Sequence, residues 1–154
     1  MFKQKAKQTG ITLIEVLVSV IIFSVGLLGL AALQLNSLKF TESASLRSEA
    51  VFLAYEAADR IRASARLSTG GQGVPLSQFA IGLDTVPVCS GNCAVHTREL
   101  VEWKEGVAGL PAGKSSITVV DNMVTITVQW EENRTQADLD IDRGLRKFSF
   151  VTRI

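Results

Sequence analysis

An uninterrupted apolar segment near the N-terminus constrains this chain more than any other feature. The eighteen residues from Val16 to Leu33 contain no charged side chain, and residues 11–35 contain one, Glu15. At about 1.5 Å per residue, a helix over residues 11–35 is roughly 37 Å long, which is enough to cross a hydrocarbon layer of about 30 Å with some tilt. We therefore expect a membrane-spanning helix, followed by a water-soluble domain of ordinary composition.

The first ten residues are basic and contain no acid, which is the general form of an export signal. The same charge bias predicts that the N-terminus stays in the cytoplasm and that the C-terminal domain lies in the periplasm. An ordinary signal peptide would end in small residues after the apolar segment, but Ala31-Ala32-Leu33 is a poor cleavage site. The lysines that carry this bias are Lys3, Lys5 and Lys7.

The junction between the basic and apolar segments reads Gly10-Ile11-Thr12-Leu13-Ile14-Glu15. This motif closely resembles that of type IV prepilins and pseudopilins. In that family a short basic leader ends in glycine, an apolar residue follows, and glutamate is the fifth mature residue. The resemblance implies that prepilin peptidase cleaves between Gly10 and Ile11 and methylates the new amino group of Ile11. Phenylalanine is commoner than isoleucine at the first mature position, which bears on methylation efficiency rather than on the class.

Glu15 is an acid near the start of the apolar segment, where burial of a charge costs a few kcal/mol unless it is paired or hydrated. One interpretation is that its carboxylate reaches the nearby interface. The other follows from the resemblance, which implies that the carboxylate pairs with a free α-amino group in a filament. Such a pair would fix the axial register of neighbouring helices and offset the burial of either charge.

The apolar pattern continues beyond residue 35 at helical spacing, on one face of an amphipathic helix. No proline precedes Pro75, and Gly70-Gly71 is a natural stop signal. We therefore predict one helix from about Ile11 to about Arg66, with its second half packed on the following domain. The residues of the predicted packing face are Leu46, Ala50, Leu53, Ala57 and Ile61.

Gly26 and Gly29 lie inside the apolar half, where each lowers helix propensity by about 1 kcal/mol relative to alanine. Small residues of this kind permit close helix packing. They also permit local stretching of the helix in a filament, and both interpretations stay open. The resulting organisation is a leader at 1–10, a membrane or filament-core helix at 11–35, an amphipathic continuation at 36–66 and a globular head at 67–154.

Two cysteines, Cys89 and Cys93, lie in a glycine- and proline-rich stretch. A disulfide is the default state of such a pair in an exported domain. Free thiols and a metal site that includes His96 are the alternatives, but zinc would lack an evident fourth ligand. We expect a structural disulfide that fixes a loop, and we expect His96 to be a surface or capping residue.

The rest of the head predicts an α+β fold: a helix packed on an antiparallel sheet of three or four strands, as in the type IV pilin fold. A helix is expected over Thr97–Val107, with Thr97 as its N-cap, and a hairpin is expected to turn at Asp121-Asn122. Residues 131–144 are polar and predict a loop. The strands are predicted at Ile117–Val120, Val124–Trp130 and Phe148–Ile154, with Val124, Ile126, Val128 and Trp130 on one face.

Composition argues against several other classes of function. The net charge is +1, and the head has no dense basic run with interleaved aromatic residues, so we expect no nucleic-acid binding. No nucleophile, base and orienting group surround the single histidine, so we expect no enzyme and no cofactor. A calcium-binding loop that starts at Asp138 would need glycine at position 143 and glutamate at position 149. This chain has Arg143 and Ser149 there, so we expect no calcium site. The late basic residues Arg143, Arg146, Lys147 and Arg153 are predicted to form a solvated strand face.

A finer resemblance covers most of the chain and is strongest up to about residue 66. The motifs resemble those of PilV-type minor pilins, also called type IV pilus modification proteins. This implies a non-catalytic subunit that helps initiate pilus assembly in the inner membrane and then enters the filament, with other minor pilins, the major pilin, the assembly platform and a tip adhesin as partners. The motifs are Gly26–Gln34, Arg47–Ala50, Leu53-Ala54, Ala58–Ala63, the cysteine pair, Glu99-Leu100 with Trp103, Leu110-Pro111 with Gly113, and Val128 with Trp130.

Two alternatives stay open from sequence. A minor pseudopilin of a type II secretion system would have nearly the same N-terminal half. A membrane-anchored periplasmic binding module is the alternative from a different class, and it predicts binding activity in a head that lacks residues 1–35.

Overall fold

The computed structural model describes residues 12–66, 74–132 and 144–154. It separates into two compact units, divided between Thr41 and Glu42, and each unit is described by itself below. Gly10, Ile11, the Gly70-Gly71 stop signal and the aspartates at 138, 140 and 142 lie outside the described residues.

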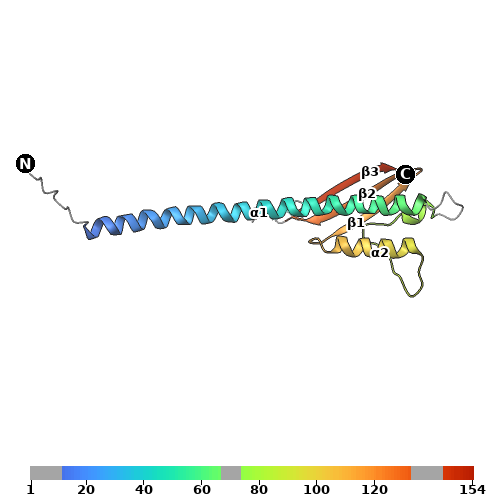
Figure 1. Cartoon of the computed structure of the whole chain (residues 1–154), viewed down its shortest axis with the longest axis horizontal. Coiled ribbons are helices and arrows are strands. Elements are labelled where there is room, and N and C mark those ends of the chain that lie inside the picture. The colour runs from blue at the N-terminus through green and yellow to red at the C-terminus, as the bar shows by residue number, and fades with distance from the viewer. Residues whose placement is uncertain (1–11, 67–73, 133–143) are drawn as a thin grey trace, which may run out of the picture. The chain divides into compact units, whose positions relative to one another are not determined.

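The first unit consists of the N-terminal part of helix α1, which runs from Leu13 to Arg66 over 54 residues (Figure 1). The helix starts on the Thr12 carbonyl, which accepts the N–H groups of Glu15 at 3.0 Å and Val16 at 3.4 Å. The two serines of the apolar segment, Ser19 and Ser24, each donate a 2.7 Å bond to the carbonyl four residues earlier. Their hydroxyls are thus satisfied within the helix. The predicted long helix is confirmed.

The second unit is built on an antiparallel sheet with the strand order β1-β2-β3. Its strands are β1 (Lys114–Val120), β2 (Met123–Glu131) and β3 (Leu145–Arg153). Val120 pairs with Met123, so the hairpin turns at Asp121-Asn122 as predicted. The final strand is also confirmed. Each of the three strands begins earlier in the sequence than predicted. The α+β fold class is therefore the one expected from sequence.

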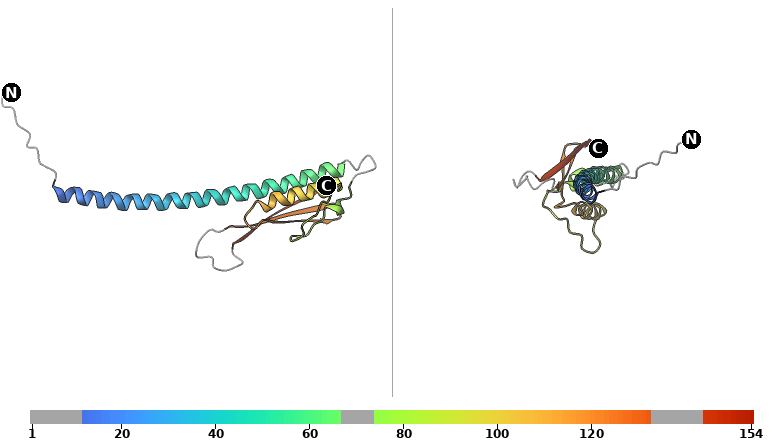
Figure 2. Two further views of the ribbon diagram at one scale, coloured as in Figure 1. Left: turned by 90° about the horizontal axis from the view of Figure 1, so that it is seen from below. Right: turned by 90° about the vertical axis from the view of Figure 1, so that its left-hand side faces the viewer.

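One face of this sheet is covered by the second half of α1 and by α2 (Val95–Ala108), which Figure 2 shows alongside each other. The alternation predicted for β2 is confirmed, because its four inward residues are buried. The face predicted on α1 is also confirmed, with Leu46 partly buried at its margin. The buried apolar residues are Ala50, Leu53, Ala54, Ala57, Ala58, Ile61, Phe79, Leu100, Trp103, Val107, Leu110, Ile117, Val124, Ile126, Val128 and Trp130.

A buried polar contact joins three elements at one end of this core. The hydroxyl of Ser43, on α1, donates to the carboxylate of Glu132, which follows β2. Arg146, on β3, brings its Nε to 3.3 Å from the same carboxylate, whose side chain is 3% exposed. Arg146 was predicted to belong to a solvated basic face, and this is wrong: its position on the inward face of β3 directs it at a buried acid.

The start of α2 differs from the prediction. The N-cap is Ala94 and not Thr97, and no side chain caps the helix. The reason is that the Ala94 carbonyl accepts the N–H groups of Thr97 at 3.0 Å and Arg98 at 3.2 Å, so helical bonding begins three residues before the predicted cap. The preceding stretch also contains a short 3-10 helix, η2 (Leu76–Phe79), and a bridge between Ile81 and Ile117.

Candidate functional site

The apolar surface of the first unit is the most conspicuous functional feature. Every large apolar side chain from Leu13 to Phe40 is at least 47% exposed. Monomeric soluble proteins rarely expose so long an apolar surface, because contact with water is unfavourable. Among the described residues, one helix, α1, is long and apolar enough to cross a membrane, with a mean hydropathy of 2.7 in its most apolar window. Lipid or neighbouring apolar helices are therefore the environments that suit this surface.

Glu15 lies in the first turn of α1, within this apolar surface. Its side chain is exposed, and no cation pairs with it within residues 12–66, 74–132 and 144–154. A carboxylate in the first turn interacts favourably with the positive end of the helix dipole. The fold thus presents an acid where a neighbouring group could reach it. Gly10 and Ile11, which complete the predicted cleavage and methylation site, lie outside the described residues.

The head contains a disulfide between Cys89 and Cys93, whose Cα atoms are 5.6 Å apart. Inside the ring, Gly91 has a φ of 70° and its carbonyl accepts the N–H of Cys93 at 3.1 Å. The bridge ends one residue before the N-cap of α2, so it fixes the approach of the chain to that helix. His96 is half-buried, and the centroid of its ring lies 5.9 Å from that of Phe79 in an edge-to-face arrangement. The described residues hold no group of three metal-ligating side chains.

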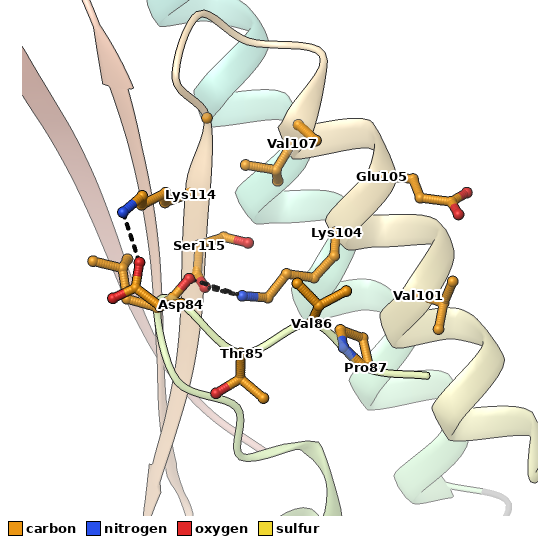
Figure 3. A pocket seen from close by; sticks show the side chains of 13 residues that line it. Asp84, Thr85, Val86, Pro87, Val101, Lys104, Glu105, Val107, Lys114 and Ser115 are labelled. Carbon is orange, nitrogen blue, oxygen red and sulfur yellow. Dashed lines mark hydrogen bonds and ion pairs between the residues drawn. The ribbon is translucent and has the colours of Figure 1, made fainter. Parts of the chain in front are cut away.

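A cleft of about 310 Å³ lies between residues 83–87, α2 and the start of β1 (Figure 3). Lys104 of α2 reaches across it and donates to the carbonyls of Gly82 at 2.9 Å, Leu83 at 3.1 Å and Ser115 at 2.6 Å. Burial lowers the pKa of Lys104 from its ordinary value. Because three carbonyls engage the amine, its evident role is to attach the 83–87 segment to the helix and the sheet.

At the rim of the cleft, Lys114 donates a 2.6 Å bond to Asp84. This bond and the charge of Lys114 lower the pKa of the exposed Asp84 carboxyl. Neither the cleft nor Lys104 was predicted from sequence. A lysine on the polar side of a short helix carries no signal of its partners when these are backbone carbonyls from other segments.

Comparison with known proteins places the N-terminal features in a class. Residues 5–31 match the family described as the prokaryotic N-terminal methylation motif. The match supports a protein of the type IV pilin and pseudopilin class, in which subunits are structural. It implies processing by prepilin peptidase and assembly with other pilins, and it fits membrane anchoring through the apolar helix. No curated protein and no solved structure significantly matches the chain.

Proposed function

We propose that this chain is a minor pilin of the PilV type, which helps to initiate type IV pilus assembly and is incorporated into the filament. The observation that carries the proposal is the continuity between the methylation motif at residues 5–31 and the exposed apolar part of α1. A leader of that kind supplies a processed N-terminus, and the helix supplies the surface that neighbouring subunits cover. The order of motifs in the head supports the PilV type.

In this proposal residues 1–10 are a cytoplasmic leader that is cut between Gly10 and Ile11, and the amino group of Ile11 is methylated. Residues 11–35 anchor the protein in the inner membrane, and the head, from residue 67, lies in the periplasm. Assembly then withdraws the helix from lipid into the filament core. Exposed apolar side chains suit both environments, because lipid and packed helices both exclude water.

Glu15 is proposed to set the register of the helix in the filament. Its carboxylate has no cation beside it in the described structure, and the helix around it is mainly apolar, with the hydroxyl of Ser19 bonded to the Glu15 backbone carbonyl. An α-amino group of an adjacent subunit would supply the opposite charge where solvent is excluded, and there an unpaired carboxylate would be costly. The head would supply contacts to other minor pilins, the major pilin and a tip adhesin.

The processing test is the intact mass and N-terminal sequence of the membrane-extracted protein, with and without prepilin peptidase. We expect a chain that starts at Ile11, with or without one methyl group, only when the peptidase is present. A chain that starts at Met1 in both cases, or one cut after Ala31 or Ala32, would contradict the pilin class.

The role of Glu15 is tested by Glu15→Ala in the native host. We expect normal cleavage but loss of the subunit from sheared pili, measured by immunoblot. The matched control is Glu42→Ala, because Glu42 is also an exposed acid of α1 but lies beyond the apolar segment. Equal incorporation of the two variants would contradict a role in register.

A minor pseudopilin of a type II secretion system is the second candidate, because the methylation motif occurs in both classes. Deletion of the gene that encodes this chain distinguishes the two candidate functions. Loss of surface pili with normal protein secretion supports the minor pilin, whereas loss of secretion with normal pili supports the pseudopilin.

A further inference from the structure

Strand β3 is an edge strand whose outer side carries no paired strand among the described residues. It pairs with β2 over all nine of its residues, from Leu145 opposite Glu131 to Arg153 opposite Met123, without a bulge. It contains no proline. A long, regular edge of this kind is a template for one more strand unless something covers it.

The register identifies the backbone groups of β3 that point outward. The backbone N–H and C=O of Ile117 both form hydrogen bonds with Ile81. These two groups of Ile117 therefore point away from β2. In an antiparallel ladder, hydrogen-bonded residue pairs alternate with pairs that are not hydrogen-bonded. Ile117 and Ile126 are a pair of the second kind, so the N–H and C=O of Ile126 point to the other side, toward Phe150 of β3. Even-numbered residues of β3 therefore bond to β2. The odd-numbered residues Lys147, Ser149 and Val151 present their N–H and C=O groups to the outside.

Three further bonds support this assignment. Glu131, an odd-numbered residue at the end of β2, donates its N–H toward the β1 side, to Pro111 at 2.8 Å. The next residue, Glu132, donates its N–H toward the β3 side, to Gly144 at 2.8 Å. Ile154 is even-numbered, and its N–H points inward, to the carbonyl of Asn122 at 3.1 Å. All three follow the same alternation.

The side chains at this edge favour an acidic partner. The odd-numbered residues of β3 point to the open face of the sheet, and they include two exposed cations, Lys147 and Arg153, but no acid. Between and beside these cations lie the exposed Val151 and Leu145. Opposite charges on neighbouring strands stabilise pairing, whereas like charges oppose it. Two copies of this edge would bring four cations onto one sheet face, which disfavours a second copy as the occupant.

We propose that the outer edge of β3 binds a β-strand of a partner protein, and that this strand carries carboxylates on the side chains facing the open side of the sheet. Main-chain bonds to Lys147, Ser149 and Val151 would supply affinity, and the two cations would select for acidic strands. The proposal goes beyond the proposed pilin function. It depends on neither cleavage at Gly10 nor pairing of Glu15, so it can fail while that function stands.

The first arm of the test measures binding of a fluorescent peptide, Thr-Glu-Val-Glu-Thr-Glu-Val-Glu-Thr, to the full chain in detergent. We expect Lys147→Glu to weaken binding about tenfold. The matched control is Lys114→Glu. It makes the same charge change on the same open face, but on β1 at the opposite edge of the sheet. We expect it to change the affinity for the peptide less than about twofold. An absence of binding to the unaltered chain, or equal weakening by both variants, would overturn the proposal.

The second arm reads the backbone directly, by residue-resolved hydrogen exchange on the full chain. We expect the amides of Lys147, Ser149 and Val151 to exchange faster than those of Phe148 and Phe150 in the chain alone. Saturating peptide should slow the first three. A peptide methylated on alternate backbone nitrogens should not bind, because it lacks the donors. Retained protection of Phe148 and Phe150 in Lys147→Glu shows that the variant is folded.

Three results of this second arm contradict the idea. Outer amides that are protected without peptide and without self-association would mean that the chain itself fills the edge. Protection that grows with protein concentration, together with a dimer in sedimentation, would mean that a second copy does so. Unchanged exchange with bound peptide would mean that the peptide binds elsewhere.

Discussion

The indole nitrogen of Trp103 donates a 2.9 Å hydrogen bond to the backbone carbonyl of Leu53. The two residues lie on α2 and α1, so a side chain of one helix is joined to the main chain of the other. One turn further along α2, a Cβ on Gly106 would lie 3.3 Å from the Cδ2 of Leu53. The hydrogen bond and the close approach together fix how α2 lies against α1.

The contribution of this hydrogen bond can be isolated with a pair of substitutions. Trp103 and Trp130 are both 2% exposed, but the Trp130 indole nitrogen has no hydrogen-bond partner in the described part of the chain. Changing either to phenylalanine removes the same atoms, whereas only Trp103→Phe removes a bond. We expect Trp103→Phe to lower the free energy of unfolding by about 1 kcal/mol more than Trp130→Phe does.

Urea unfolding of the full chain in detergent, followed by near-UV circular dichroism, measures this difference. Equal losses for the two variants would mean that the bond adds no net stability and that Trp103 acts through packing alone.

The parts of this fold that sequence predicts are those determined by local periodicity. The face from Ala50 to Ile61 follows helical spacing, and β2 alternates strictly, so each element could be assigned without its partner. The N-cap of α2 was missed because the Ala94 carbonyl, and no side chain, begins the helix. The role of Arg146 was missed because its acid, Glu132, follows another strand.

The same distinction holds for the candidate sites. The methylation motif and Glu15 are contiguous in sequence, so the pattern alone identified them, and residues 5–31 match a known family. The cleft around Lys104 and the open edge of β3 depend instead on which segments lie next to one another. The side chains that line the cleft come from three separate segments of the chain. The partners of Lys104 and the outer groups of β3 are backbone atoms, which residue types do not reveal.

Lys104 is predicted to hold the 83–87 segment in position. Lys104→Met keeps most of the aliphatic side chain but removes the lysine donor from the carbonyls of Leu83 and Ser115. The Gly82 carbonyl also loses the lysine, but it still accepts the Thr85 N–H at 3.3 Å. We expect a loss of about 1–3 kcal/mol in the free energy of unfolding. Lys114→Met is the matched control, because Lys114 contacts the exposed Asp84 at the same cleft, and we expect a much smaller loss there. Equal losses would contradict the anchoring role of Lys104.

The lowered pKa of Lys104 also predicts a pH dependence in alkaline solution. In the folded chain the amine loses its proton below the ordinary pKa of 10.5, because burial disfavours the charged form. Between the folded pKa and 10.5 the unfolded chain therefore binds more protons, and stability contributed by this group rises with pH. Lys104→Met should remove that rise, and unfolding midpoints measured across the alkaline window test it. An identical pH profile in the variant would contradict the assignment.

The β1–β2 turn offers a test of backbone strain. Asp121 has a φ of 53°, in the left-handed region, where a side chain is disfavoured and glycine is not. We expect Asp121→Gly to be neutral or to raise the free energy of unfolding by up to about 1 kcal/mol, and Asp121→Val to lower it by about 1–2 kcal/mol. Asn122→Gly is the matched control, because Asn122 does not have a positive φ. Its side-chain amide donates to the Ile154 carbonyl at 3.3 Å, and glycine would lose this bond, so we expect this variant to be destabilised. Urea unfolding of the three variants gives the comparison, and a loss for Asp121→Gly as large as that for Asn122→Gly would contradict the strain argument.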